Sequence, residues 1–117
     1  VSISSSSKLT DAVYALEELH TRVLIVVDEE GRPLGYVNDH ELLRYIEQGK
    51  DLFLSDVKLH DVPKIDENAK AESVLDVFER EEVPVIAVVD SSGILVGSIL
   101  EREVLRYLLG RRTLRAA

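Results

Sequence analysis

The chain has 117 residues, 22 of them acidic and 14 basic, so its formal net charge is −8 at pH 7. That length is typical of one ordinary domain, and the acidic balance argues against nucleic-acid binding, which depends on clustered Lys and Arg. The absence of Cys excludes a disulfide framework, a thiolate zinc site and a cysteine nucleophile.

No apolar run approaches the roughly 20 residues that a membrane-spanning helix needs, and no signal peptide is recognisable. We therefore expect a cytoplasmic protein without a membrane-inserted segment. Because the chain opens at Val1 and contains no Met, we expect it to be either a piece of a longer protein or a processed chain.

The first half predicts a strand, a helix, two strands and a second helix. Apolar residues mark the first helix at helical spacing: Leu9, Ala12, Val13, Leu16 and Leu19. We expect Ser7 to cap this helix. The β-branched run after it predicts a strand that is covered on both faces, and Asp28–Gly31 predicts a tight hairpin. The three strands are expected at residues 1–3, 23–27 and 34–37, and the second helix at 39–48.

The second half repeats this order at an offset of 62 residues, without a gap. Val23–Asp28 matches Val85–Asp90, Gly31 matches Gly93, and Gly35 matches Gly97. The equivalent strands are expected at residues 62–65, 85–89 and 94–99, and the closing helix at 101–109. The remaining helix carries the apolar residues Ala71, Val74, Leu75 and Phe78.

Such an ordered set of matches indicates a tandem duplication. We predict an α+β fold in which two β-α-β-β-α repeats pack about a pseudo-twofold axis. The first repeat is expected at residues 1–49, a connector at 50–61, the second repeat at 62–110 and a tail at 111–117.

The duplicated pattern resembles the cystathionine-β-synthase (CBS) domain family over nearly the whole chain. The resemblance rests on Val-Val-Asp at the end of both apolar strands, on the turn glycine that follows, and on Val83-Pro84. It also rests on Gly35–Glu41 and Gly97–Glu103, which share the pattern Gly-x-apolar-x-x-x-acidic. The resemblance implies a regulatory pair that often forms a flat dimer and binds adenine nucleotides, S-adenosyl compounds or divalent metal between its repeats.

The segment before the second helix is the strongest candidate for ligand binding. In ligand-binding members of that family, a Ser or Thr at the position of Asn38 and an Asp at that of Glu41 hold the ribose and phosphate. Here Asn38 keeps the hydrogen-bonding capacity and Glu41 keeps the carboxylate on a longer side chain, so the resemblance implies these two residues as ligand contacts. The same two residues fit a capping box, with Asn38 capping the helix and Glu41 reaching back to its backbone N–H, and both roles can coexist. In the second repeat Leu100 and Glu103 stand at these positions. Leu100 can neither cap nor bind a phosphate, so we predict that nucleotide binds better in the first repeat.

Further site residues are implied on the first strand of each repeat and at the start of each apolar strand. They are Ile3, Ser4, Thr21, Arg22, Lys64, Ile65, Asp66, Val83 and Pro84. Arg22 occupies the place of Pro84 and is a candidate for contacting a phosphate; the alternative is a solvated arginine at a strand start.

For the other charged groups, a surface or structural role competes with a role in ligand or metal binding. His20, His40 and His60 lack the spacing of metal ligands and are expected at the surface. Asp28–Glu30 could collect Mg²⁺, although adjacent carboxylates on a turn do not form a convergent cage. The Arg-rich end, which begins at Arg102, could pair with a ligand phosphate or an acidic partner; the alternative is a tail that is solvated or that docks on the acidic part of its own chain.

We predict a regulatory module that senses an adenosine-type ligand, such as AMP, ADP, ATP or an S-adenosyl compound, and controls a parent domain, enzyme or transporter. The alternatives are an interaction module without a small-molecule ligand and a divalent-metal sensor. No nucleophile–base pair or phosphate-binding glycine loop points to an enzyme. We expect a homodimer through Arg44-Tyr45 and Arg106-Tyr107, although these residues also suit packing within one chain.

Overall fold

The computed structural model describes residues 2–106. The first repeat contains β1 (Ser2–Ser4), α1 (Leu9–Glu18), β2 (Val23–Val27), β3 (Pro33–Asn38) and α2 (Asp39–Glu47). After a connector with a 3-10 turn at Leu54–Asp56, the second contains β4 (Lys64–Asp66), α3 (Ala71–Glu81), β5 (Val85–Val89), β6 (Leu95–Leu100) and helical residues 101–106. The predicted α+β fold with two β-α-β-β-α repeats is confirmed.

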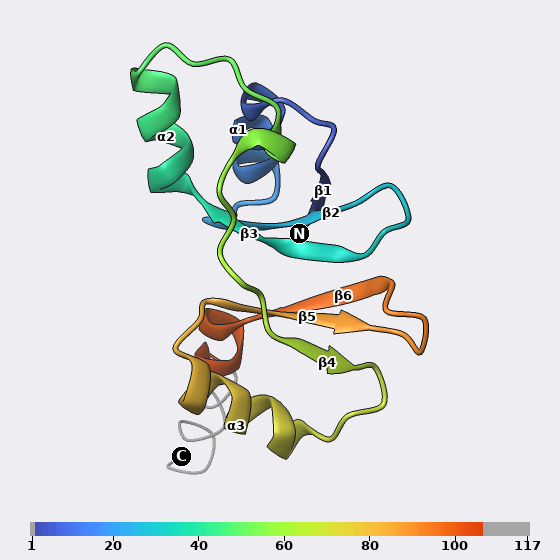
Figure 1. Cartoon of the computed structure of the whole chain (residues 1–117). Coiled ribbons are helices and arrows are strands. Elements are labelled where there is room, and N and C mark those ends of the chain that lie inside the picture. The colour runs from blue at the N-terminus through green and yellow to red at the C-terminus, as the bar shows by residue number, and fades with distance from the viewer. Residues whose placement is uncertain (1, 107–117) are drawn as a thin grey trace.

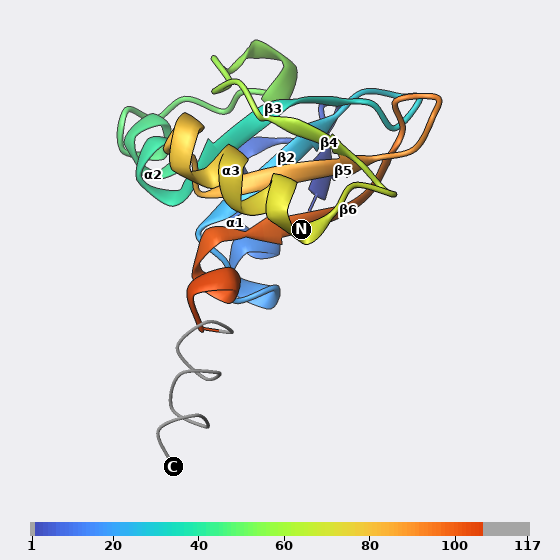
Figure 2. The same cartoon turned by 90° about the horizontal axis from the view of Figure 1, so that it is seen from below.

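Each repeat forms one three-stranded sheet, and the two sheets share strand order and register. The orders are β1-β2-β3 and β4-β5-β6, each with one parallel and one antiparallel pairing. Ser2 pairs with Ile25 and Lys64 pairs with Ala87, so the offset of 62 residues applies to pairing as well. The two sheets face each other and the helices cover their outer faces (Figure 1). In the view turned by 90°, the strands of the second sheet lie over those of the first (Figure 2).

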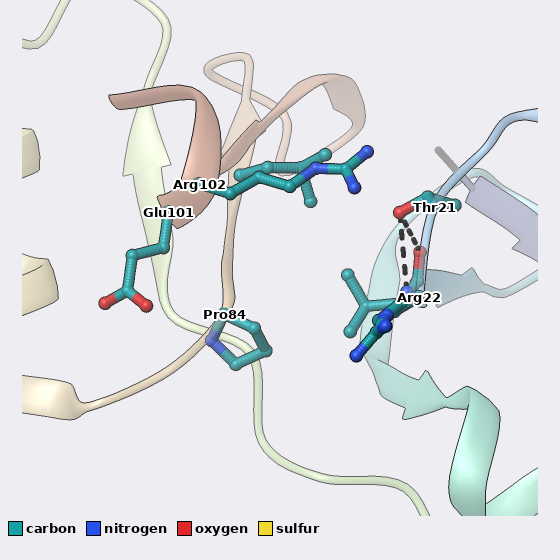
Figure 3. A pocket seen from close by; sticks show the side chains of 7 residues that line it. Thr21, Arg22, Pro84, Glu101 and Arg102 are labelled. Atoms are coloured by element: carbon teal, nitrogen blue, oxygen red, sulfur yellow. Dashed lines mark hydrogen bonds between the residues drawn. The ribbon is translucent and has the colours of Figure 1, made fainter. Parts of the chain in front are cut away.

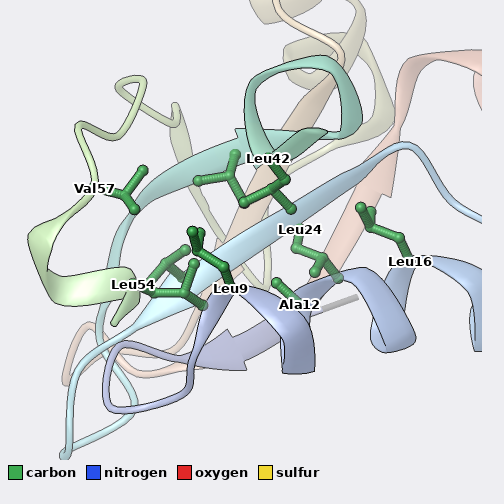
Figure 4. Packing of buried hydrophobic residues seen from close by; sticks show 9 residues of the cluster. Leu9, Ala12, Leu16, Leu24, Leu42, Leu54 and Val57 are labelled. Atoms are coloured by element: carbon green, nitrogen blue, oxygen red, sulfur yellow. The ribbon is translucent and has the colours of Figure 1, made fainter. Parts of the chain in front are cut away.

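The central strand β2 is buried on both faces, as predicted. Leu24 and Val26 face the helices of the first repeat and belong to its core. Other members of this core are Leu9, Ala12, Leu16, Val37, Leu42, Leu54 and Val57 (Figure 4). Val23 and Ile25 face the second repeat and pack with Val62, Val85, Ala87 and Leu100. Alternate residues of one apolar strand therefore build the core of a repeat and the contact between repeats.

Two local predictions are wrong. The N-cap of α1 is Lys8 rather than Ser7, because Lys8 is extended and its backbone N–H donates to Asp11 Oδ2 at 3.0 Å. β4 begins at Lys64, not at residue 62. Pro63 has no N–H to donate to a ladder, and Val62 is instead buried in the contact between the repeats.

Candidate functional site

A pocket of about 160 Å³ lies where the two repeats meet. It is lined by Thr21, Arg22, Val23, Pro84, Leu100, Glu101 and Arg102. Three of these, Thr21, Arg22 and Pro84, are predicted site residues. Figure 3 shows Pro84 between the segment with Thr21 and Arg22, which precedes β2, and the helical segment with Glu101 and Arg102.

Backbone hydrogen bonds hold the pocket walls in equivalent ways in the two repeats. The carbonyl of Arg22 accepts from the N–H of Asp39 at 2.9 Å, and the carbonyl of Pro84 accepts from the N–H of Glu101, also at 2.9 Å. Each bond ties the residue before an apolar strand to the start of a helix. The Thr21 hydroxyl is buried and donates to the carbonyl of Val23 at 3.2 Å, so its orientation is set by the first residue of the strand that follows it.

Two arginines from different repeats border the pocket. Both Arg22 and Arg102 are exposed, and Arg102 Nη2 donates to the carbonyl oxygen of His20 at 2.7 Å. That bond crosses between repeats, and Figure 3 shows the Arg102 side chain extending toward Thr21, which lies between α1 and β2. Guanidinium groups suit anionic oxygens, especially phosphate.

The floor of the pocket is apolar. Leu100 is only 5% exposed, and it packs with Val23 and Val85 in the contact between the repeats. A pocket of about 160 Å³ is smaller than the 300–1,000 Å³ or so that enclose a drug-sized ligand. The arrangement therefore suits an anionic group and the atoms next to it, with the rest of a larger ligand outside the pocket.

Asn38 and Glu41 lie outside this pocket and are bonded to each other. Asn38 Oδ1 accepts from the N–H of Glu41 at 3.0 Å, and Asn38 Nδ2 donates to Glu41 Oε1 at 2.8 Å. The predicted helix cap is confirmed for Asn38. Glu41 differs from the prediction, because its carboxylate bonds the side chain of Asn38 rather than the backbone N–H.

The connector supplies a further partner for Glu41. His60 Nε2 hydrogen-bonds Glu41 Oε1, and the His60 ring stacks on Tyr36 with centroids 5.0 Å apart. The backbones of Tyr36 and His60 exchange two hydrogen bonds, of 2.9 and 3.0 Å. Burial raises the pKa of the Tyr36 hydroxyl, and the nearby Glu41 carboxylate raises it further.

Sequence reasoning placed His60 at the surface without a role. The side chain is indeed 47% exposed, but it is paired with a residue that lies 19 positions earlier. No short-range spacing signals such a contact. Of the other pocket residues, sequence reasoning flagged Arg102 for its charge and dismissed Leu100.

The remaining predicted site residues do not line the pocket. Ile3 packs against the core of the first repeat, and the Ser4 hydroxyl bonds that of Ser6 at 2.8 Å. Asp66 Oδ1 accepts from the N–H of Asn68 at 2.8 Å, which stabilises a turn. Lys64 and Glu103 are exposed, whereas Ile65 and Val83 are half-buried.

The acidic hairpin turn has a structural role. Asp28 Oδ1 accepts from the N–H groups of Glu30 and Arg32, at 3.0 and 2.8 Å. Asp90 makes the equivalent bonds to Ser92 and Ile94. Within residues 2–106, no group of three or more His, Asp or Glu side chains could hold a metal ion. Nor does this part of the chain contain a helix with the length and apolar character to cross a membrane.

Comparison with known proteins agrees with the geometry. The family model described as CBS domain matches residues 1–48 and 54–110. Inosine-5'-monophosphate dehydrogenase from Nitrosopumilus maritimus is 27% identical over 103 residues, which cover 88% of this chain and 21% of that protein. The chain thus spans about a fifth of the length of this curated relative.

Solved structures share the fold. The CBS domain pair of protein MJ0100, in complex with 5'-methylthioadenosine and S-adenosyl-L-methionine, has a TM-score of 0.76 at 18% identity, covering 92% of this chain and 90% of that one. The CBS domain protein PAE2072 from Pyrobaculum aerophilum, complexed with AMP, has a TM-score of 0.71 at 18% identity, covering 87% and 80%.

Proposed function

Because this chain belongs to the CBS domain family, we propose that it is a regulatory module that binds an adenosine-type ligand between its repeats and thereby controls a fused or partner protein. The observation that carries the proposal is the pocket bordered by Arg22 and Arg102. Its chemistry, an apolar floor beside two cations from different repeats, fits a phosphate and the adjoining sugar.

Binding at this place would link the two repeats, which the Arg102–His20 hydrogen bond already joins beside the pocket. Arg22 directly precedes β2 of the first repeat, and Arg102 lies in the helical segment that follows β6 of the second. An anion held by both guanidinium groups joins these elements, so occupancy changes how firmly the repeats are held together. That change is the signal we propose for a partner domain.

Asn38 and Glu41 form the equivalent place in the first repeat, and we propose it as a second site for the same class of ligand. Glu103, exposed at the start of the final helix, is the proposed acceptor for ribose hydroxyls near the Arg22 pocket. Ile3, Ser4, Lys64, Ile65, Asp66 and Val83 remain proposed contacts for the parts of the ligand outside the pocket.

Titration calorimetry of the full chain with AMP, ADP, ATP and S-adenosylmethionine tests the proposal. We expect Arg22→Ala to weaken binding of the preferred ligand about tenfold or more, since a hydrogen bond to a charged group contributes roughly 1.5–3 kcal/mol. Arg32→Ala is the matched control, because Arg32 is also exposed but lies in the hairpin turn. Equal affinities for the two variants, or no binding of any of these ligands, would contradict the proposal.

Exposed apolar side chains favour a second function, self-association. Tyr14 on α1 is 70% exposed, and Leu43 on α2 is 50% exposed. Tyr45, predicted at a subunit contact, packs against the core of its own repeat instead, and Tyr107 lies outside the described residues. We propose a homodimer through the α1 and α2 surfaces. Light scattering should give twice the chain mass, and a stable monomer at high micromolar concentration would refute the dimer.

A further inference from the structure

The connector crosses the edge of β3 at very short range. A Cβ atom added to Gly35 would lie 2.5 Å from the carbonyl oxygen of His60 and 2.8 Å from Leu59 Cβ. Gly35 does not have a positive φ, so the close approach, rather than an unusual backbone conformation, explains the glycine. The two hydrogen bonds between the backbones of Tyr36 and His60 hold the connector in this position.

At this crossing, the His60 side chain contacts the carboxylate of Glu41, which the proposed first-repeat site needs for binding a ligand. Glu41 Oε1 already receives Asn38 Nδ2 and is bonded to His60 Nε2. The His60 ring also stacks on Tyr36. Both contacts end on Oε1, so a ribose hydroxyl that donates to this oxygen must displace one of the two partners. Displacing the imidazole also separates it from Tyr36.

The second repeat provides an internal comparison. Gly97 is equivalent to Gly35, yet among the described residues the only atom within 4 Å of an added Cβ there is Val88 Cβ at 3.8 Å. Ser98 replaces Tyr36, so the second repeat has no aromatic ring at that position. Within residues 2–106, Glu103 makes no ion pair or side-chain hydrogen bond equivalent to that of Glu41.

We propose that His60 is a gating residue that keeps the first-repeat site closed, so that the chain binds one nucleotide and not two. The inference rests on the proposed function. This proposal reverses the preference for the first repeat that we expected from the sequence. The open pocket near Leu100 and Arg102 takes the ligand, while the site at Asn38 and Glu41 opens only when the connector contact of His60 is broken. Movement of the connector therefore sets the number of bound ligands.

Calorimetric stoichiometry with AMP tests the gate. We expect one AMP per chain for the unmodified protein and for His40→Ala, which removes an exposed imidazole elsewhere on α2. We expect two AMP per chain for His60→Ala. His60→Phe keeps an aromatic ring for Tyr36 but cannot hydrogen-bond Glu41, and should also bind two. In both His60 variants, AMP should shift the NMR amide signals of Asn38 and Glu41.

The outcomes separate the two proposals. One AMP per chain in every variant overturns the gate and leaves the proposed function intact. Binding only in the His60 variants supports the gate and overturns the Arg22 pocket as the site. No AMP binding in any variant overturns the gate, and it overturns the proposed function as well if ADP, ATP and S-adenosylmethionine also fail to bind.

Discussion

Replacing Gly35 with Ala forces a methyl group against the connector backbone. The added carbon would lie 2.5 Å from the His60 carbonyl oxygen, which is backbone and cannot rotate away as a flexible side chain could. The connector must shift, and the two Tyr36–His60 backbone hydrogen bonds, of 2.9 and 3.0 Å, weaken or break.

The magnitude follows from these contacts. Each lost hydrogen bond costs about 0.5–1.5 kcal/mol, so the pair costs about 1–3 kcal/mol. Replacing Gly with Ala also restricts the unfolded chain, which stabilises the folded state by about 0.4–1 kcal/mol. We expect Gly35→Ala to lower the free energy of unfolding by about 1–2 kcal/mol.

Gly97→Ala is the matched control at the equivalent position of the second repeat. Its nearest neighbour would be Val88 Cβ at 3.8 Å, an ordinary contact, so only the effect on the unfolded chain remains. This variant should be as stable as the unmodified protein or more stable by up to about 1 kcal/mol. Urea unfolding followed by circular dichroism measures both. Equal free energies of unfolding for the two variants would refute the contact between the connector and β3.

Three other substitutions test separate parts of the structure. Leu54→Ala should cost about 2–5 kcal/mol in urea unfolding, because Leu54 is fully buried and anchors the connector; a cost below 1 kcal/mol would contradict this. Asn38→Ala should cost about 1 kcal/mol through loss of the helix cap, and an unchanged stability would argue against the cap. Burial and Glu41 raise the pKa of Tyr36 above 10.0, so folding favours the neutral phenol and stability falls as pH rises above about 10. Tyr36→Phe should lose less stability than the unmodified protein between pH 9 and 11, and equal losses would contradict the assignment.

The secondary structure follows from short-range patterns. Apolar spacing locates α1, and the β-branched runs locate β2 and β5 within the bounds that the structure shows. The offset of 62 residues predicts one topology for both halves, and the register of both sheets obeys it. These features depend on neighbours along the chain, so the sequence alone contains the information.

The first residue of a strand or helix is not determined by these patterns, because it depends on single backbone hydrogen bonds. Ser7 is a good cap by residue type, but the extended Lys8 pairs with Phe53 and moves the helix start by one residue. A contact with the distant connector thus outweighed the local preference.

The composition of the candidate site depended on the tertiary structure more than the secondary structure did. Sequence reasoning named Arg22 and Pro84, which do meet in the pocket, and Asn38, which does cap its helix. Sequence reasoning judged Leu100 only by its inability to cap a helix or bind a phosphate. In the structure, Leu100 is an apolar residue buried in the contact between the two sheets.

The sequence by itself determined the duplicated β-α-β-β-α unit, since periodicity and glycine spacing act over a few residues. Only the tertiary structure decided that Arg22 and Arg102 border one pocket and that His60 closes on Glu41. The reason is physical: these pairs are brought together by the stacking of two sheets and by the path of the connector. Both depend on burial of Val23, Ile25 and their partners across the repeats, and no residue pattern within either segment encodes that geometry.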